Sequence, residues 1–124
     1  MFSPVMYYDE YAYSNQKSIK RSFKKKKFKD NFYVCALSDF DKRVEFYCAD
    51  MLNQDFYRQN DVYVIGLCKN EESALTLITN MVHNCMNSCG NLDFQTYFDK
   101  MIMQHDNKID IIVDSEGRES VRYS

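Results

Sequence analysis

The chain has 124 residues, of which 45% are hydrophobic and 15% aromatic, and its formal net charge at pH 7 is −2. This length fits one domain that can bury a core without staples, and the aromatic content excludes an intrinsically disordered chain. No segment reaches the roughly 20 apolar residues that a membrane-spanning helix needs, and the N-terminus lacks a signal-peptide pattern. We therefore expect a soluble, cytoplasmic protein with no membrane contact.

Residues 1–30 show no clean hydrophobic period, and we expect them to form a basic, tyrosine-rich arm. The compact domain is expected over residues 31–124. Within the arm, Ile19 and Phe23 are four residues apart, which suggests a short amphipathic helix. The arm also holds the residues that we expect to contact a partner: Tyr7, Tyr8, Tyr11, Tyr13, Lys20, Arg21, Lys24, Lys25, Lys26 and Lys27.

Two strands are expected next, over residues 32–37 and 43–48. The second alternates, with Val44, Phe46 and Cys48 on one side, and the polar stretch SDFDK between them suits a turn, so the pair is typical of a hairpin. Residues 49–61 are ambiguous between a continued strand and one or two helical turns. The nearly continuous apolar run VYVIGLC, residues 62–68, predicts a strand that is buried on both faces.

The strongest helix pattern in the chain follows, from Asn70 to Gly90. Asn70 suits an N-cap, Glu71 and Glu72 favour the positive end of the helix dipole, and Gly90 suits a left-handed C-terminal cap. One wide apolar stripe is expected to pack on the sheet. Its members are Ala74, Leu75, Ile78, Met81, Val82, Cys85, Met86 and Cys89.

A second helix is expected after Asp93, ending near residues 105–107. Residues 108–114 and 118–123, which flank the turn sequence DSEG, predict a closing hairpin. The order β-β-(α)-β-α-α-β-β predicts an α+β fold in a single domain, with a small antiparallel or mixed sheet and two helices on one face. The inner face of the second helix is expected to hold Phe94, Tyr97, Phe98, Met101 and Ile102.

The sequence contains no catalytic or metal-binding motif. There is no GxSxG and no P-loop. Cys85 and Cys89 share a helix face, but His83 lies about 200° away around the helix, and a structural zinc site needs four ligands. We therefore expect no enzyme, no metal and no cofactor, and free thiols at all five cysteines.

Charge is divided unevenly along the chain. Residues 1–29 carry eight bases and two acids, whereas residues 30–124 carry eight bases and sixteen acids. Three interpretations stay open: a nucleic-acid contact in which Phe23 and Phe28 stack on bases, an arm that is solvated or docked on the acidic body, and a docking segment for an acidic protein.

The four N-terminal tyrosines are the second candidate binding feature. Tyrosine supplies a large amphipathic contact area at low entropic cost and is enriched at interfaces. Tyr7, Tyr8, Tyr11 and Tyr13 are therefore candidates for a protein-binding surface, with ordinary half-buried packing as the alternative.

The stretch CADMLNQDFYRQNDVYVIGLCKNEESALTLI, with the later CGNLDFQTYF, resembles a group of small uncharacterised proteins from low-GC Gram-positive bacteria and their mobile elements. The resemblance lies in residues 64–67 at the end of a strand and residues 71–75 at the start of a helix. Lys69 and Asn70 stand where the relatives often have a glycine. The resemblance covers about 50 residues, implies no activity and suggests an accessory-gene setting.

We therefore predict a non-catalytic macromolecule-binding protein. The first expectation is a protein partner, bound by an accessory or inhibitory factor of a phage or mobile element, such as an anti-CRISPR-type inhibitor. The alternative is a nucleic-acid-binding module that uses the basic N-terminal arm. The oligomeric state is not predicted.

Overall fold

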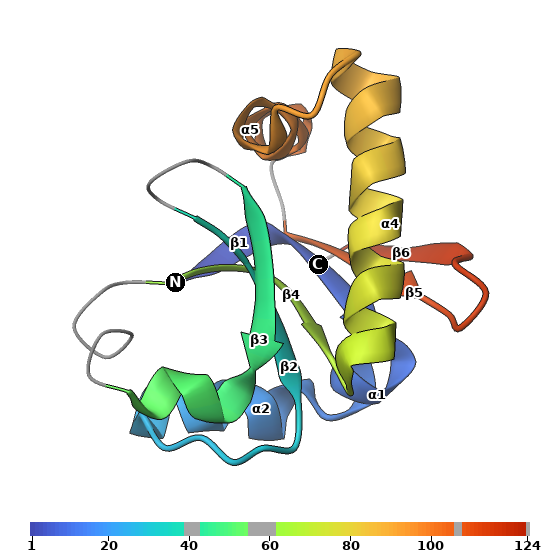
Figure 1. Ribbon diagram of the computed structural model, residues 1–124. Coiled ribbons are helices and arrows are strands. Elements are labelled where there is room, and N and C mark those ends of the chain that lie inside the picture. Colours follow the sequence, from blue (N-terminus) through green and yellow to red (C-terminus); the bar gives the residue numbers. More distant parts are fainter. Residues whose placement is uncertain (39–42, 55–61, 106–107, 124) are drawn as a thin grey trace.

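A six-stranded mixed sheet forms the centre of the computed structural model, which describes residues 1–38, 43–54, 62–105 and 108–123 (Figure 1). The strand order is β3-β2-β4-β1-β5-β6. β1 runs parallel to β4 and β5, and the other neighbouring pairs are antiparallel. The strands are β1 (Phe2–Asp9), β2 (Tyr33–Leu37), β3 (Val44–Cys48), β4 (Tyr63–Cys68), β5 (Ile109–Val113) and β6 (Glu119–Tyr123).

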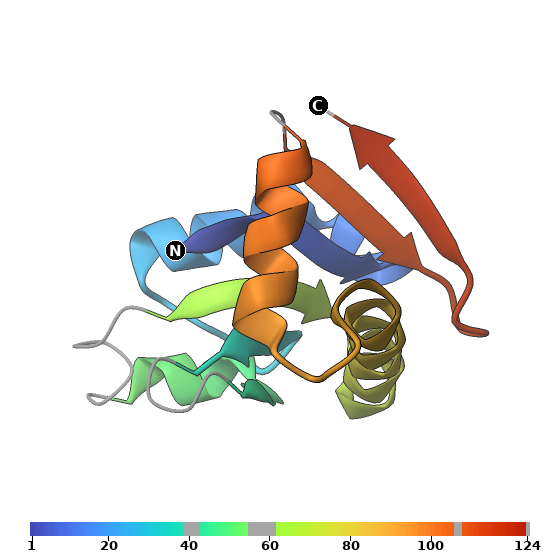
Figure 2. The ribbon, with the colours of Figure 1, turned by 90° about the horizontal axis from the view of Figure 1, so that it is seen from above.

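Helices cover both faces of this sheet. α1 (Glu10–Ser14) and α2 (Gln16–Lys25) pack on one face together with the 3-10 helix η1 (Ala49–Asn53). α4 (Glu71–Cys89) and α5 (Phe94–Gln104) pack on the other; seen from above, α5 lies across the strands with α4 beside it (Figure 2). The predicted α+β class and mixed sheet are confirmed. The predicted pair of helices and the predicted element order are incomplete, because β1, α1 and α2 precede β2 and helices cover the second face as well.

The N-terminal segment is the largest departure from the sequence-based prediction. The prediction that residues 1–30 form an arm outside the domain is wrong, because β1 lies between β4 and β5 near the middle of the sheet. Its residues Val5, Met6, Tyr7 and Tyr8 are all buried, as expected for a strand with helices on both faces. Pro4 cannot donate to a strand ladder, and it lies where the β1–β4 register shifts. The rest of the segment forms α1 and α2.

The hairpins that the sequence predicts are present. β2 pairs antiparallel with β3, and β5 with β6. β4 is buried from Val64 to Cys68, as its apolar run predicts. The predicted turn over residues 39–42, with Asp39 and Asp41, lies outside the described residues, as do residues 55–61 and residues 106–107. Of the ambiguous segment 49–61, the described part forms η1.

α4 begins and ends at the predicted residues. The Asn70 side chain accepts from the backbone N–H of Ser73 at 2.9 Å, and Gly90 adopts the left-handed conformation with φ 72°. The predicted stripe packs only in part. Its members Ala74, Met81 and Cys85 are buried, whereas Leu75 and Met86 are 51% and 45% exposed. Leu77, which the prediction left out of the stripe, is also buried. A stripe of eight apolar residues is wider than the contact that one helix makes with a sheet.

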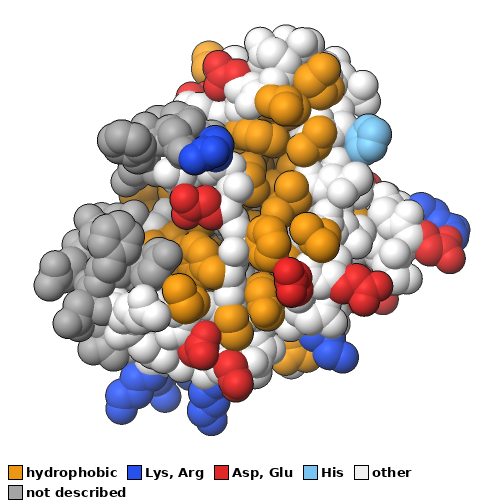
Figure 3. Space-filling model, in the orientation of Figure 1, with side chains coloured by type: hydrophobic (Ala, Val, Ile, Leu, Met, Phe, Trp, Pro, Cys, Tyr) orange, Lys and Arg blue, Asp and Glu red, His pale blue; other side chains and the backbone are white. Residues whose placement is uncertain are grey.

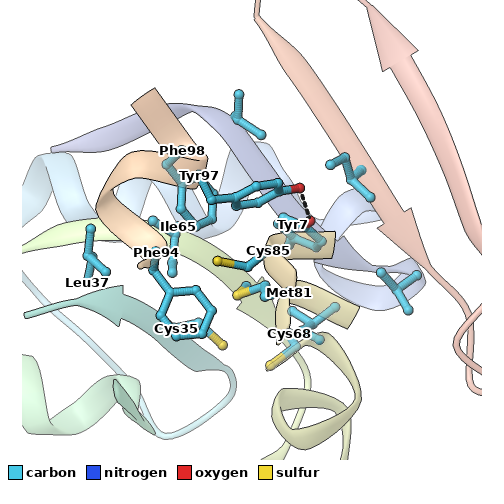
Figure 4. Packing of buried hydrophobic residues seen from close by; sticks show 14 of the residues in the cluster. Tyr7, Cys35, Leu37, Ile65, Cys68, Met81, Cys85, Phe94, Tyr97 and Phe98 are labelled. Atoms are coloured by element: carbon cyan, nitrogen blue, oxygen red, sulfur yellow. Dashed lines mark hydrogen bonds between the residues drawn. The ribbon is translucent and has the colours of Figure 1, made fainter. Parts of the chain in front are cut away.

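The core between the sheet and the α4/α5 layer is close-packed. Phe98 contacts Tyr7 and Tyr97 edge-on, with ring centroids 6.2 Å and 5.2 Å apart, and both tyrosines point between the sheet and α5 (Figure 4). Gly66 faces this core, where an added Cβ would lie 3.1 Å from Cys35 Cβ and 3.2 Å from Met81 Cε. The close approach of Cys35 on β2 and Met81 on α4 therefore favours glycine at this position.

Candidate functional site

Helix α2 and the residues after it present a basic surface. Ile19 is buried and Phe23 half-buried on the side that faces the sheet. The rings of Phe2 and Phe28 pack edge-on against Phe23 at 4.9 Å and 5.0 Å, so this side fixes how the helix lies on the sheet. The exposed bases, which we call the basic surface, are Lys17, Arg21, Lys24, Lys25, Lys26, Lys27 and Lys29.

Lys20 differs from these seven residues because it is half-buried. Its ammonium lies 5.6 Å from the centroid of the Phe2 ring and 5.8 Å from that of Tyr8. Burial raises the pKa of the Asp110 carboxyl, and Lys20 and Lys108 oppose that rise. Lys20 therefore takes part in the packing between α2 and the sheet, so we leave it out of the basic surface; its predicted role in binding a partner stays a prediction.

Among the described residues, no ion pair joins the basic surface to an acid. The ion pairs formed between described residues join Arg118 to Asp114 and to Glu116, far from α2 in the sequence. Residues 17–29 themselves contain eight bases and no Asp or Glu. Blue side chains project from the bottom of the molecule in Figure 3, where α2 lies in Figure 1. The charge is therefore exposed to solvent and available to a partner.

Local structure favours these charges at the end of the helix. Lys24 and Lys25 lie in the last turn of α2, where cations interact favourably with the negative end of the helix dipole. Lys26 closes the helix in the left-handed conformation, with φ 54°, and its N–H donates to the Phe23 carbonyl at 3.3 Å. The chain then continues to Phe28, whose backbone N–H donates to the Asn53 side chain at 3.1 Å. The backbone under the basic surface is thus held at both ends.

The tyrosine surface that the sequence suggests is not present at two of its four positions. Tyr7 and Tyr8 are fully buried, and burial raises the pKa of both hydroxyls. The Tyr7 hydroxyl lies 2.9 Å from that of Tyr97 (Figure 4) and accepts from Asn84 Nδ2 at 2.8 Å. These residues belong to the core and cannot reach a partner.

Tyr11 and Tyr13 are half-buried. Tyr11 donates to the Asn31 carbonyl at 3.3 Å, and the Lys69 ammonium lies 5.7 Å from its ring centroid. The ring of Tyr13 packs edge-on against Tyr8 at 5.6 Å. Both side chains are engaged in packing, which is the alternative that the sequence left open.

A hollow that the sequence-based reasoning missed lies at the carboxyl ends of the parallel strands β1 and β5, next to the first turns of α4. It encloses about 190 Å³ and is lined by residues that include Asp9, Ser73 and Asp114. Ligands of open α/β sheets often bind at this edge. The available signal was an aspartate after each apolar run, in YYD and in IIVD.

The aspartates of this hollow are engaged in local structure. Asp9 Oδ1 accepts from the Ala12 N–H at 2.7 Å and Oδ2 from the Lys69 N–H at 2.8 Å. Asp114 Oδ1 accepts from the N–H groups of Glu116 and Arg118, both at 2.9 Å. These carboxylates cap α1 and hold the β5–β6 turn, which is their ordinary use in turns and caps.

The two histidines lie apart. His83 lines a wider groove between α4 and the β5–β6 turn, about 510 Å³ in volume, together with Glu72 and Glu116. His105, after α5, packs its ring at 5.9 Å from that of Tyr123. Among the described residues, no group of three or more His, Cys, Asp or Glu side chains is arranged to hold a metal ion.

The cysteine pair of α4 is built into the packing of that helix. Cys85 is buried, and its thiol donates to the Asn91 carbonyl at 3.3 Å. Burial raises the pKa of this thiol. Cys89 is half-buried at the end of the helix.

Comparison with protein-family models, with curated proteins and with solved structures gives no match in any of the three. The resemblance to small proteins of Gram-positive mobile elements therefore stays a prediction. Within residues 1–38, 43–54, 62–105 and 108–123, no helix combines the length and apolar character needed to span a bilayer.

Proposed function

We propose that the protein is a non-catalytic macromolecule-binding protein whose basic surface binds the phosphate backbone of nucleic acids. The observation that carries this proposal is the group of seven exposed bases on α2 and the residues after it, in a stretch, residues 17–29, that contains no Asp or Glu. Lys and Arg side chains that neutralise phosphates release condensed counterions, which gives affinity without sequence preference. The function is thus the nucleic-acid alternative that the sequence analysis kept open.

The position of the bases on a fixed helix strengthens the proposal. Lys17, Arg21 and Lys24 recur at intervals of four and three residues, so they lie along one face of α2, neighbours being about 5–6 Å apart. Ile19 and Phe23 hold the opposite face against the sheet. Less conformational freedom is lost on binding from an ordered helix than from a flexible arm, and preorganisation favours affinity.

The rest of the molecule orients this contact. Outside residues 17–29 the chain carries eight bases and eighteen acids, so the rest of the chain is acidic. A polyanion is attracted to the α2 side and repelled by the remaining surface. We therefore expect a small contact along one edge of the protein, without a duplex laid across the whole domain.

Base stacking has less support than backbone contact. Phe23 and Phe28, which the sequence analysis considered as stacking residues, are half-buried and pack against one another and, through Phe23, against Phe2 and Phe32. The rings would have to leave this cluster to reach a base. We therefore propose a backbone contact that tolerates any sequence.

An acidic protein surface is the second candidate partner, because the same unpaired bases would bind carboxylates. An accessory or inhibitory role in a phage or mobile element, as expected from the sequence, would then act through this surface. The loss of Tyr7 and Tyr8 from the expected interface removes one of the two features that favoured a protein partner.

Fluorescence anisotropy with a labelled oligonucleotide of about 20 nucleotides, single-stranded and in a duplex, tests the proposal. We expect binding of both at low salt, with affinity that falls steeply as salt rises. The triple variant Lys24→Glu/Lys25→Glu/Lys27→Glu should bind at least about tenfold more weakly, because three attractive contacts become repulsive.

The matched control is Lys69→Glu/Lys100→Glu/Arg122→Glu, which changes the net charge equally at exposed bases outside the basic surface. We expect this control to retain most of the affinity. Equal loss in both variants, or no binding of either oligonucleotide at low salt, would contradict the proposal. Binding of polyglutamate without binding of nucleic acid would favour the acidic protein partner instead.

A further inference from the structure

The basic surface has two parts, and the first is a stripe of bases along α2. At about 100° per residue, these bases fall within a sector of about 100° around the helix. They are Lys17, Arg21, Lys24 and Lys25, all exposed. Ile19 and Phe23, which pack toward the sheet, lie on the opposite side of the helix. The stripe is therefore straight and about 12 Å long, at about 1.5 Å per residue.

The second part follows the end of α2, where the chain turns back. Its members are Lys26, Lys27 and Lys29, all exposed. The Lys27 N–H donates to the Ser22 carbonyl at 3.2 Å, which with the left-handed residue before it makes a Schellman motif. The Phe28 ring then packs against Phe23, and the Asn53 side chain binds the Phe28 N–H and carbonyl at 3.1 Å and 2.7 Å. The bases of the second part therefore lie around the end of the helix and do not continue the straight stripe.

Acidic residues border this turn. Asp30 follows the last base of the surface in the sequence, and Asp50 lies in η1, one turn before Asn53; both side chains are exposed. Because Asn53 binds the Phe28 backbone, η1 lies against the turn. One row of phosphates can follow the bases and avoid these acids, whereas a second row beside it would be brought toward them and repelled.

We propose that the basic surface prefers single-stranded nucleic acid, which follows the stripe along α2 and bends with the chain onto Lys27 and Lys29. This inference rests on the proposed function, since the same bases contact phosphates. A single strand is flexible enough to make the bend. A duplex has a persistence length of about 50 nm, so it is nearly straight over the width of this protein and reaches only the bases of the stripe.

Fluorescence anisotropy at about 0.1 M salt tests the preference, with a labelled oligothymidine of about 20 nucleotides and its duplex with the complementary strand. Each neutralised phosphate contributes about 0.7 to the salt slope on a single strand and about 0.9 on a duplex. Since the single strand reaches both parts of the surface and the duplex one, we expect the single strand to bind at least about threefold more tightly. A duplex that binds as tightly as the single strand would overturn the preference.

The variant Lys27→Gln/Lys29→Gln separates the two parts of the surface. We expect it to bind the single strand about tenfold more weakly and the duplex with nearly unchanged affinity, because only the single strand reaches these two bases. The matched control Lys17→Gln/Arg21→Gln removes two charges from the stripe and should weaken both complexes about tenfold. All four side chains are exposed, so both variants should fold like the wild type, which circular dichroism checks.

The two nucleic acids also distinguish a failure of this inference from a failure of the proposed function. Equal losses for single strand and duplex in Lys27→Gln/Lys29→Gln would overturn the bent path, while the phosphate contact through the basic surface would stand. Absence of binding of either nucleic acid by the wild type would overturn the proposed function and this inference with it.

Discussion

Tyr7 and Tyr8 are neighbours on β1, but their side chains enter different cores because successive strand residues point to opposite faces of a sheet. Tyr7 belongs to the cluster under α4 and α5, where its hydroxyl bonds to Tyr97 and Asn84. Tyr8 belongs to the cluster under α1 and α2, where its hydroxyl is buried without a hydrogen-bond partner in the described part of the chain. The two hydroxyl groups should therefore contribute to stability with opposite sign.

We predict that Tyr7→Phe lowers the free energy of unfolding by about 1–2 kcal/mol, because the Tyr97 hydroxyl and the Asn84 amide each lose a hydrogen-bond partner. The control Tyr8→Phe removes only an unpaired buried hydroxyl and should leave stability unchanged or raise it by up to about 1 kcal/mol. Urea unfolding followed by circular dichroism measures both. A larger loss in Tyr8→Phe than in Tyr7→Phe would mean that the Tyr8 hydroxyl does bind a buried group or water.

Residue patterns could not decide the burial of these tyrosines. Tyrosine is amphipathic, so four of them in seven residues suit a binding surface and a core equally well. The adjacent aspartate and glutamate, Asp9 and Glu10, favoured the surface interpretation. In the structure these acids lie where β1 ends and α1 begins, so they mark the end of a buried strand.

At the scale of elements, β1 shows why a central strand can escape detection. It has no alternation, because helices cover both of its faces, and Pro4 argues against a strand interior. By contrast, β4 was predictable because its apolar run is uninterrupted and a strong helix cap follows it directly. The pairing of β1 with β4 and β5 spans some sixty and one hundred residues of sequence, which no local pattern encodes.

Helix α4 depends on its N-cap, and here sequence and structure agree. We predict that Asn70→Ala lowers the free energy of unfolding by about 1 kcal/mol, because the Ser73 N–H loses its acceptor. Asn70→Asp should be nearly neutral, since the carboxylate accepts the same bond and favours the helix dipole.

Thermal unfolding followed by circular dichroism measures these cap variants, with Asn87→Ala as the control. Asn87 is exposed within the helix, and alanine is the better helix former there, so the control should be neutral or stabilising. Equal destabilisation by Asn70→Ala and Asn70→Asp would contradict a role for the side chain as a hydrogen-bond acceptor.

Periodicity predicted the apolar width of α4 but not what covers it. The sheet and α5 bury Leu77, Met81 and Cys85, while Leu75 and Met86 remain outside. A sequence pattern records every apolar position of a helix, whether it meets the core of the same chain or another molecule. That Leu75 and Met86 extend beyond the part of α4 that the sheet covers became visible only with the structure.

On the scale of the whole molecule, bases are concentrated on α2 and the residues after it, whereas the rest of the chain is acidic. The uneven distribution was evident from the sequence, but an arm tethered to an acidic body was the wrong geometry for it. α2 is packed on the sheet through Ile19 and Phe23, so the bases are fixed relative to the acidic remainder.

The salt dependence of oligonucleotide binding tests the central claim most directly, because its slope counts the phosphates that the protein neutralises. For a duplex, each neutralised phosphate contributes about −0.9 to the slope of log K against log salt concentration. We predict that Lys24→Gln/Lys25→Gln/Lys27→Gln makes the slope less negative by about 2–3, whereas Lys69→Gln/Lys100→Gln/Arg122→Gln leaves it nearly unchanged. A wild-type affinity that does not change with salt, or equal slopes in the wild type and the basic-surface variant, would contradict a phosphate contact through α2.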